Sequence, residues 1–208
     1  MGVIILILIW RKSFQYNKNS SFHYFFAQRL VHTNKDKMRI IKASKRRRIM
    51  RIAFAGNPNS GKTTMYNALT GRNERVGNWA GVTVERKESP IKKGYYDGTE
   101  ELVAVDLPGA YSMSPFTSEE SITSGYVKNE NPDVIINIVD ATNLSRSLFF
   151  TTQLLELGIP VVVALNKSDI VNKKQTKIDE KILSEKLGCP VIKTFSTSSG
   201  HERTQKRL

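Results

Sequence analysis

The stretch GNPNSGKTT, residues 56–64, constrains the fold of this chain more than any other part of its sequence. It matches the pattern G-x-x-x-x-G-K-[ST] in full. The apolar segment 51–55 precedes it, and a helical pattern follows at about residues 62–70. A glycine-rich loop between a strand and a helix binds phosphate groups through its backbone N–H groups. The motif therefore predicts an α/β fold of the P-loop NTPase class.

The residue types of this loop fit the chemistry of a nucleoside triphosphate. The ammonium of Lys62 can reach the β- and γ-phosphates, and the hydroxyl of Thr63 can bind Mg²⁺. We expect the whole loop to contact the nucleotide: Gly56, Asn57, Pro58, Asn59, Ser60, Gly61, Lys62, Thr63 and Thr64.

Apolar segments and helical patterns alternate after residue 50, which indicates a mostly parallel sheet with helices on both faces. Six segments are predicted to be strands: 51–55, 84–94, 101–106, 133–140, 160–166 and 189–195. Helices are predicted at 145–158 and 179–188, each ending at a glycine.

The sequence NKSD, residues 166–169, directly follows a predicted buried strand and points to guanine. One carboxylate can accept both the N1–H and the N2–H₂ of guanine, and Asp169 is placed to do so. Adenine would leave that carboxylate unpaired, which is costly. Asn166 either binds the edge of the base or braces the phosphate loop, and the stem of Lys167 lies along the base plane.

Two further segments complete the expected site. DLPG at 106–109 ends a predicted strand, so that Asp106 would hold Mg²⁺ through a water and the N–H of Gly109 would meet the γ-phosphate. FSTSSG at 195–200 suits a last base-contacting loop, with N–H groups near Ser196 and Thr197 facing the guanine oxygen. This order of motifs predicts a Ras-like G domain that hydrolyses GTP to GDP and phosphate.

The residue after DLPG is Ala110, where many GTPases have a glutamine that orients the attacking water. Its methyl group cannot orient water. We therefore expect slow hydrolysis unless another group, a cation or a partner completes the site.

Three stretches resemble the cytosolic G domain of FeoB-type ferrous iron transporters: GNWAGVTVERKE at 77–88, DLPGAYSMSP at 106–115 and IVDATNLSRSLFFTTQLLELGIPVVVALN at 138–166. The resemblance extends over about residues 50–200. It implies that Gly81, Val82 and Thr83 contact GTP, and that Thr83 closes on Mg²⁺ and the γ-phosphate. It also implies that Asn59 binds a K⁺ ion that supplies positive charge, which makes Lys62, Thr83 and Asn59 the expected catalytic residues.

The residues alone leave other roles open at three of these positions. Thr83 can be a β-branched residue at the start of a strand, and Asn59 can form an Asx turn. Trp79 can be an exposed loop aromatic or a lid over the nucleotide. The resemblance favours the functional roles of Thr83 and Asn59.

Charge divides the chain into two parts. Of the 32 Lys and Arg residues 13 lie in residues 1–51, together with only one of the 19 acidic residues. The remainder is close to neutral, so RNA binding by the whole domain is not expected. We expect residues 1–49 to be a basic, aromatic extension. It is either disordered, translated from a start codon placed too early, or an arm that binds RNA or a membrane surface.

Two features of the sequence bear on the cellular compartment of the chain. The longest apolar run, residues 3–10, is too short to span a bilayer, which takes about 20 residues. The single cysteine, Cys189, excludes an intrachain disulfide and fits a reducing cytosol as a small buried apolar residue.

The resemblance also implies partners. Full-length family members continue into a helical domain and a membrane permease, and we expect the G domain to act at the inner face of the cell membrane. Residues 50–208 contain neither partner domain and are expected to lack the last helix of the G domain. A truncated gene, a frameshift and an incompletely defined gene all fit this sequence.

Three functions remain open from the sequence. The first is a slow GTPase switch domain of a ferrous iron uptake transporter. The second is a stand-alone GTPase in ribosome or RNA maturation with a basic RNA-contacting tail, and the third is an inactive fragment.

Overall fold

The computed structural model describes residues 49–71, 75–79, 84–96, 100–173 and 178–194. The described strands are β1 (Ile49–Gly56), β2 (Arg75–Asn78), β3 (Glu85–Pro90), β4 (Glu101–Asp106), β5 (Val134–Asp140), β6 (Val161–Asn166) and β7 (Val191–Thr194). The α-helices are α4 (Lys62–Thr70), α5 (Ser118–Asn129), α6 (Leu144–Glu156), α7 (Ser168–Lys173) and α8 (Glu180–Leu187). Two short 3-10 helices are η1 (Lys93–Tyr95) and η2 (Ala141–Asn143).

The strands form one sheet in the order β2-β3-β4-β1-β5-β6-β7. β2 and β3 are antiparallel to their neighbours, and all other pairs are parallel. The predicted P-loop fold with a mostly parallel sheet and helices on both faces is confirmed, but the predicted count of six strands is wrong. The seventh strand, β2, has the sequence RVGN, which is too short and too polar to give an apolar alternation.

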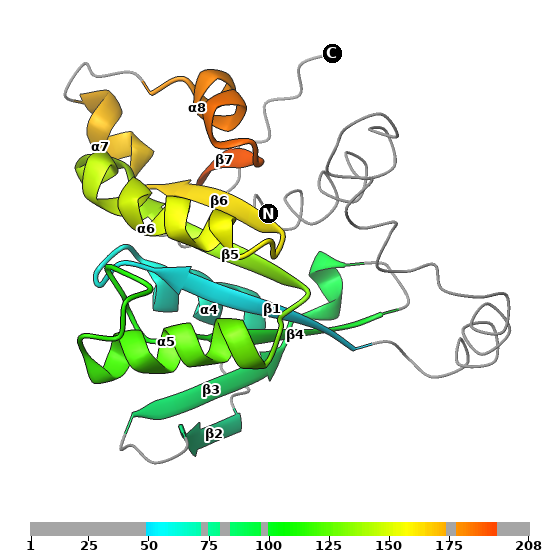
Figure 1. Ribbon diagram of the computed structural model, residues 1–208. Helices are drawn as coiled ribbons and strands as arrows, with labels where there is room; N and C mark the ends of the chain where they lie inside the picture. Colours follow the sequence, from blue (N-terminus) through cyan, green and yellow to red (C-terminus); the bar gives the residue numbers. More distant parts are fainter. Residues whose placement is uncertain (1–48, 72–74, 80–83, 97–99, 174–177, 195–208) are drawn as a thin grey trace, which may run out of the picture.

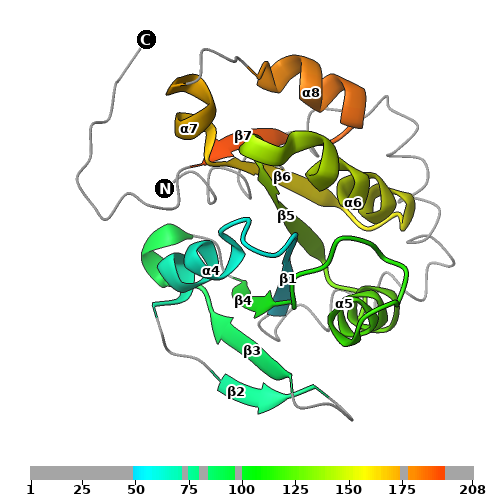
Figure 2. The ribbon, with the colours of Figure 1, turned by 90° about the vertical axis from the view of Figure 1, so that its left-hand side faces the viewer.

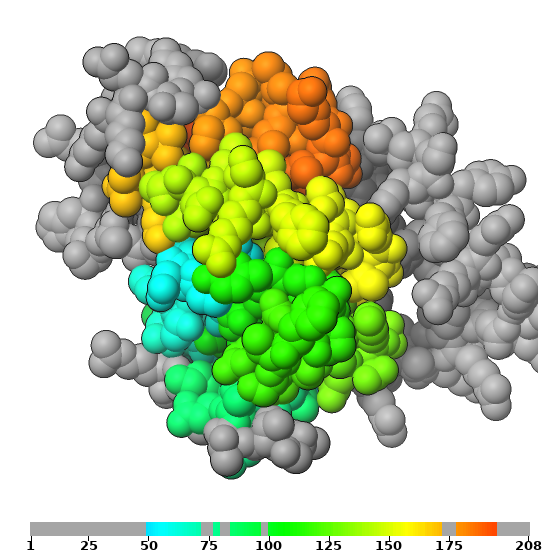
Figure 3. Space-filling view, turned by 60° about the vertical axis from the view of Figure 1, so that its left-hand side comes forward, coloured from blue at the N-terminus to red at the C-terminus, as the bar shows by residue number. Residues whose placement is uncertain are grey.

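Helices cover the two faces of the sheet unequally (Figure 1 and Figure 2). On one face, Met65, Tyr66 and Leu69 of α4 pack into a core with strand residues such as Phe54 and Ile136. On the other face, α5, α6 and α8 lie side by side (Figure 3). The central strands are buried on both sides, which explains why β5 and β6 are almost continuously apolar.

Some predicted boundaries are wrong. The segment 84–94, expected to be one strand, is β3 followed by η1, with Pro90 at the end of the strand. α5 was not predicted, because its sequence SEESITSGYVKN has no clear apolar stripe. The expected absence of a helix after the last strand falls on 195–208, outside the described residues.

Cys189 is buried, as predicted, beside β7. Burial raises the pKa of its thiol to about 11. The thiol is therefore protonated at neutral pH and behaves as an apolar side chain. Within the described part of the chain, no helix has the length and apolar character needed to cross a membrane.

Candidate functional site

The phosphate loop runs from the end of β1 to the start of α4, as predicted from the sequence. Gly56 is required there because a Cβ at this position would lie 2.6 Å from the backbone oxygen of Ile138 on the neighbouring strand. Gly61 has φ 94° and directly precedes α4. Asn59 also adopts a left-handed conformation, with φ 62°. The loop thus turns sharply and presents the N-terminus of a helix, which favours anions.

Asp106 lies beside the two residues expected to bind phosphate and magnesium. The ammonium of Lys62 forms a short ion pair with Oδ1 of Asp106, and the hydroxyl of Thr63 donates a 3.1 Å hydrogen bond to Oδ2. Asp106 is 8% exposed and the Lys62 side chain 10%. A hydroxyl and a carboxylate at this distance are ligands that suit Mg²⁺, so the donor set fits the expected metal.

The segment after Asp106 packs directly on the phosphate loop. A Cβ at Gly109 would lie 3.1 Å from atoms of Pro58, so a side chain there would push the two segments apart. The N–H of Ala110 donates to the backbone oxygen of Gly56 at 3.2 Å. This packing places Gly109 against the phosphate loop, and its contact with the γ-phosphate stays a prediction.

The NKSD segment reaches the phosphate loop from β6. Asn166 is fully buried and donates a 2.8 Å hydrogen bond to the backbone oxygen of Ser60, which supports bracing over base binding. The ammonium of Lys167 donates to the backbone oxygen of Asn59 at 2.7 Å and to Oδ2 of Asp140 at 2.6 Å. Asp169, the predicted reader of guanine, is half-buried in the first turn of α7.

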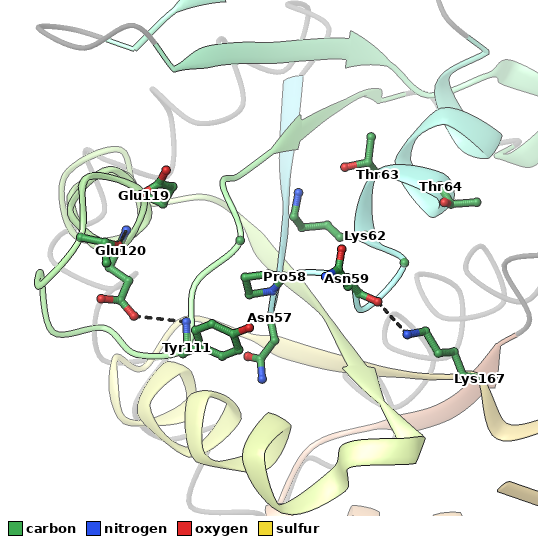
Figure 4. Close-up of a pocket in the computed structure, with 13 residues that line it drawn as sticks. Asn57, Pro58, Asn59, Lys62, Thr63, Thr64, Tyr111, Glu119, Glu120 and Lys167 are labelled. Carbon is green, nitrogen blue, oxygen red and sulfur yellow. Dashed lines mark hydrogen bonds between the residues drawn. The ribbon is translucent and has the colours of Figure 1, made fainter. Parts of the chain in front are cut away.

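A cavity of about 770 Å³ lies over these segments. Figure 4 shows the ammonium of Lys167 hydrogen-bonded to Asn59, and the phosphate loop beside Lys62 and Thr63. The predicted site residues that line the cavity are Asn57, Pro58, Asn59, Gly61, Lys62, Thr63, Thr64, Gly109 and Lys167. Among the described residues, no group of three or more His, Cys, Asp or Glu side chains could hold a metal ion. A magnesium ion here would therefore depend on nucleotide oxygens and waters as well.

Four lining residues were missed by the sequence analysis: Tyr111, Thr117, Glu119 and Glu120. Thr117 caps α5 by accepting a 3.1 Å hydrogen bond from the N–H of Glu120. The sequence T-S-E-E matches the capping-box pattern, which could have revealed this helix. The carboxylate of Glu120 instead accepts from the N–H of Tyr111 at 3.3 Å, so it fixes the loop after DLPG.

Trp79 occupies neither of the two places considered for it. It is 7% exposed and packs edge-to-face on Tyr126 of α5, with ring centroids 5.5 Å apart. The backbone N–H of Trp79 donates to the backbone oxygen of Val84 at 2.9 Å, which links the residue after β2 to the residue before β3. Trp79 is thus a core residue beneath α5, and the proposed roles as exposed aromatic or nucleotide lid are wrong.

The remaining predicted contacts lie outside the described residues. These are Gly81, Val82 and Thr83 before β3, and Ser196 and Thr197 after β7. Their roles stay predictions.

Comparisons with known proteins agree with this geometry. The family model described as "Ferrous iron transport protein B" matches residues 50–207. Over 151 residues the chain is 53% identical to the Fe(2+) transporter FeoB of Salmonella typhimurium and 52% identical to that of Escherichia coli. Each alignment covers 70% of this chain and 19% of the relative, so the chain spans about a fifth of the length of these transporters.

Similar solved structures include FeoB proteins. A GDP-bound mutant of S. thermophilus NFeoB has a TM-score of 0.66 and 50% identity, covering 71% of this chain and 56% of the other. The G domain of the T. maritima FeoB iron transporter has a TM-score of 0.64 and 37% identity, covering 71% of this chain and 88% of the other. One of these similar proteins is thus a G domain, and another was solved with a guanine nucleotide.

Proposed function

The chain belongs to the ferrous iron transport protein B family, and from that premise we propose that residues 50–208 bind guanine nucleotide and hydrolyse GTP. The observation that carries this proposal is the meeting of three distant segments at one cavity. Lys62 lines it from the phosphate loop, Gly109 from the DLPG segment, and Lys167 from the end of β6. Residues 1–49 would be a separate extension.

The proposed reaction is displacement at the γ-phosphate by water. Lys62 would exchange its contact with Asp106 for phosphate oxygens and stabilise their charge. Thr63 and Asp106, with Thr83, would hold Mg²⁺, which when bound neutralises the charge between the β- and γ-phosphates. The donor set of Thr63 and Asp106 supports this assignment.

Hydrolysis by the chain alone should be slow. Ala110 is 1% exposed and its side chain is a methyl group, so it cannot orient a water. We propose that a K⁺ ion at Asn59 supplies the missing charge. Asn59 is exposed and lines the cavity, which is compatible with a cation bound between this loop and the phosphates.

Thermal unfolding tests the nucleotide assignment. The whole chain would be heated with Mg²⁺ and KCl in the presence of GDP, ADP or neither. A ligand at about 100 times its Kd stabilises the folded state by about 2.7 kcal/mol, which raises the Tm by roughly 5–10 °C for a domain of this size. GDP should raise the Tm and ADP should not, whereas equal shifts would contradict the guanine assignment.

Hydrolysis and its cation dependence need a second measurement. Phosphate release from GTP would be followed in KCl and in NaCl at equal ionic strength. The proposal expects faster release in KCl and no difference in a variant with Asn59→Ala. Equal rates in the two salts would remove K⁺ from the mechanism while leaving GTP binding intact.

In the whole transporter, we propose that this domain acts as a GTP-dependent switch at the inner face of the membrane and controls Fe²⁺ uptake through the helical and membrane domains. Support comes from the identity of 52% to the Escherichia coli transporter. A chimera of that transporter carrying residues 50–200 of this chain should restore Fe²⁺ uptake to cells that lack it. The same chimera with Lys62→Ala should not, and equal uptake by both would contradict the switch role.

A further inference from the structure

Two neighbouring strands bring opposite charges together at one end of the sheet. β5 ends at Asp140 and β6 ends at Asn166, and these two residues are paired in the parallel register. Lys167, the next residue along the chain, therefore lies beside Asp140. Its ammonium is 2.6 Å from Oδ2 of Asp140, whose side chain is only 15% exposed.

The same ammonium also holds the phosphate loop. It donates a 2.7 Å hydrogen bond to the backbone oxygen of Asn59 (Figure 4). Lys167 and Asn59 are both non-glycine residues in the left-handed region, with φ 60° and 62°. Such backbone conformations persist only where surrounding contacts hold them. The Lys167 ammonium is one contact that the two strained residues share.

Asp140 uses its two carboxylate oxygens for different purposes. Oδ1 accepts from the N–H and the hydroxyl of Thr142, at 2.9 and 2.6 Å, and so caps η2. Oδ2 accepts from Lys167 alone among the hydrogen bonds of the described residues. Burial raises the pKa of Asp140, but the hydrogen bonds from Lys167 and Thr142 outweigh it, so the pKa lies below its usual value. The carboxylate is therefore an anion at neutral pH.

We propose that Asp140 is a positioning residue for nucleotide binding, which holds Lys167 against the backbone oxygen of Asn59 and so fixes the base-reading loop to the phosphate loop before nucleotide arrives. The inference rests on the proposed function. Lys167 and Asn59 line the cavity, whereas Asp140 is not among its lining residues and acts through Lys167. A lysine side chain has many rotamers, and restricting them in advance reduces the entropy lost on binding.

A purely structural role for Asp140 predicts something different. If the carboxylate only capped η2, removing it would change the Kd for GDP by the same factor whether residue 167 is lysine or methionine. A double-mutant cycle separates the two cases because it measures whether one side chain acts through the other. The variants are Asp140→Ala, Lys167→Met and the double variant, and the readout is the Kd for GDP by titration calorimetry.

Asp140→Ala is expected to weaken GDP binding about tenfold in the wild-type background and not at all in the Lys167→Met background. Thr142→Val removes one partner of Oδ1 while leaving the contact with Lys167, and should bind GDP like the wild type. If Asp140→Ala weakens GDP equally in both backgrounds, or in neither, the inference is overturned. If the wild type does not bind GDP, the proposed function fails and this inference fails with it.

Asp140→Asn provides a second route if the alanine variant does not fold. An amide offers one oxygen in place of two, so its NH₂ group must face either Thr142 or the Lys167 ammonium, both of which are donors here. In one orientation the bond from the Lys167 ammonium is lost, and in the other it goes to a neutral oxygen and is no longer an ion pair. In either case the variant should bind GDP more weakly than the wild type, again only when Lys167 is present. Wild-type affinity in a folded Asp140→Asn variant would overturn the inference.

Discussion

The side-chain amide of Asn166, at the end of β6, donates a 2.8 Å hydrogen bond to the backbone oxygen of Ser60 in the phosphate loop. The two residues are 106 positions apart, and both are almost completely buried. This bond joins the phosphate loop to the end of β6. It connects the first residue of the NKSD segment, three positions before the predicted base-reading carboxylate of Asp169, with the phosphate loop.

Asn166→Ala should therefore destabilise the domain as well as weaken nucleotide binding. Removing the amide leaves the buried oxygen of Ser60 without this donor, which costs about 1–3 kcal/mol. Urea unfolding measures the free energy of unfolding directly. Asn143→Ala is a matched control, because Asn143 is exposed and makes no side-chain capping bond at the start of α6, and it should change stability by less than about 0.5 kcal/mol. Equal losses in the two variants would show that the bond to Ser60 contributes nothing specific.

Lys62→Ala should lower the affinity for GTP by roughly 10- to 100-fold. A hydrogen bond to a charged group is worth about 1.5–3 kcal/mol, and the ammonium of Lys62 is expected to make such bonds to phosphate. The substitution also leaves the buried Asp106 without its ion-pair partner, which adds repulsion toward the phosphates. Titration with a fluorescent GTP analogue provides the measurement. Lys186→Ala removes a lysine from the exposed last turn of α8 and should leave affinity unchanged, and unchanged affinity in Lys62→Ala would refute the phosphate-loop assignment.

Asp169→Asn should shift the preference of the site from guanine to xanthine. Guanine offers two donors to a carboxylate, whereas an amide at this position has a donor that pairs with the C2 oxygen of xanthine. The experiment compares the Kd values for GDP and XDP in the wild type and the variant. The wild type should favour GDP and the variant XDP. Retention of the full guanine preference by a folded variant would mean that Asp169 does not read the base.

Much of this site was predictable because its parts are short, local and confined to fixed loops. Residues 56–64 and 166–169 each stand at the end of a strand, β1 and β6, as their sequence patterns predict. A strand followed by such a loop can be predicted from adjacent residues alone, without knowing which distant segments it contacts. Nine of the expected contacts line the cavity, whereas five others among the described residues do not: Gly56, Ser60, Asp106, Asn166 and Asp169.

The parts that were missed depend on tertiary contacts. Among the described strands β2 pairs with β3 alone, and its four residues carry no periodic pattern of their own. α5 is stabilised at one end by the Thr117 cap and along its length by packing of Tyr126 against Trp79. Trp79 itself was misassigned because a lone aromatic in a glycine-containing loop does not reveal which element covers it. These contacts become visible only when the sheet and α5 are in place.

Arg86 on β3 contacts both Trp79 and residues of α5. Its guanidinium lies 4.8 Å from the centre of the Trp79 ring and 5.8 Å from that of Tyr126. It also donates to Glu88 at 2.8 Å and to Glu130 at the end of α5 at 3.4 Å. Because Trp79 and Arg86 flank the segment that contains Thr83, this cluster anchors both ends of the loop expected to close on GTP.

Arg86→Ala should lower the free energy of unfolding by about 1–2 kcal/mol, since a cation over aromatic rings contributes about 0.5–2 kcal/mol and partly exposed ion pairs less than about 1 kcal/mol. Removing the guanidinium should also admit water to the Trp79 ring and shift its fluorescence to longer wavelength. Arg51→Ala is the matched control, because Arg51 pairs with the same Glu130 at 3.3 Å but its side chain is 46% exposed. The variants would be built with Trp10→Phe, so that Trp79 is the remaining tryptophan. If both arginine variants lose the same stability and neither shifts the emission, the ring contacts of Arg86 do not hold Trp79 against α5.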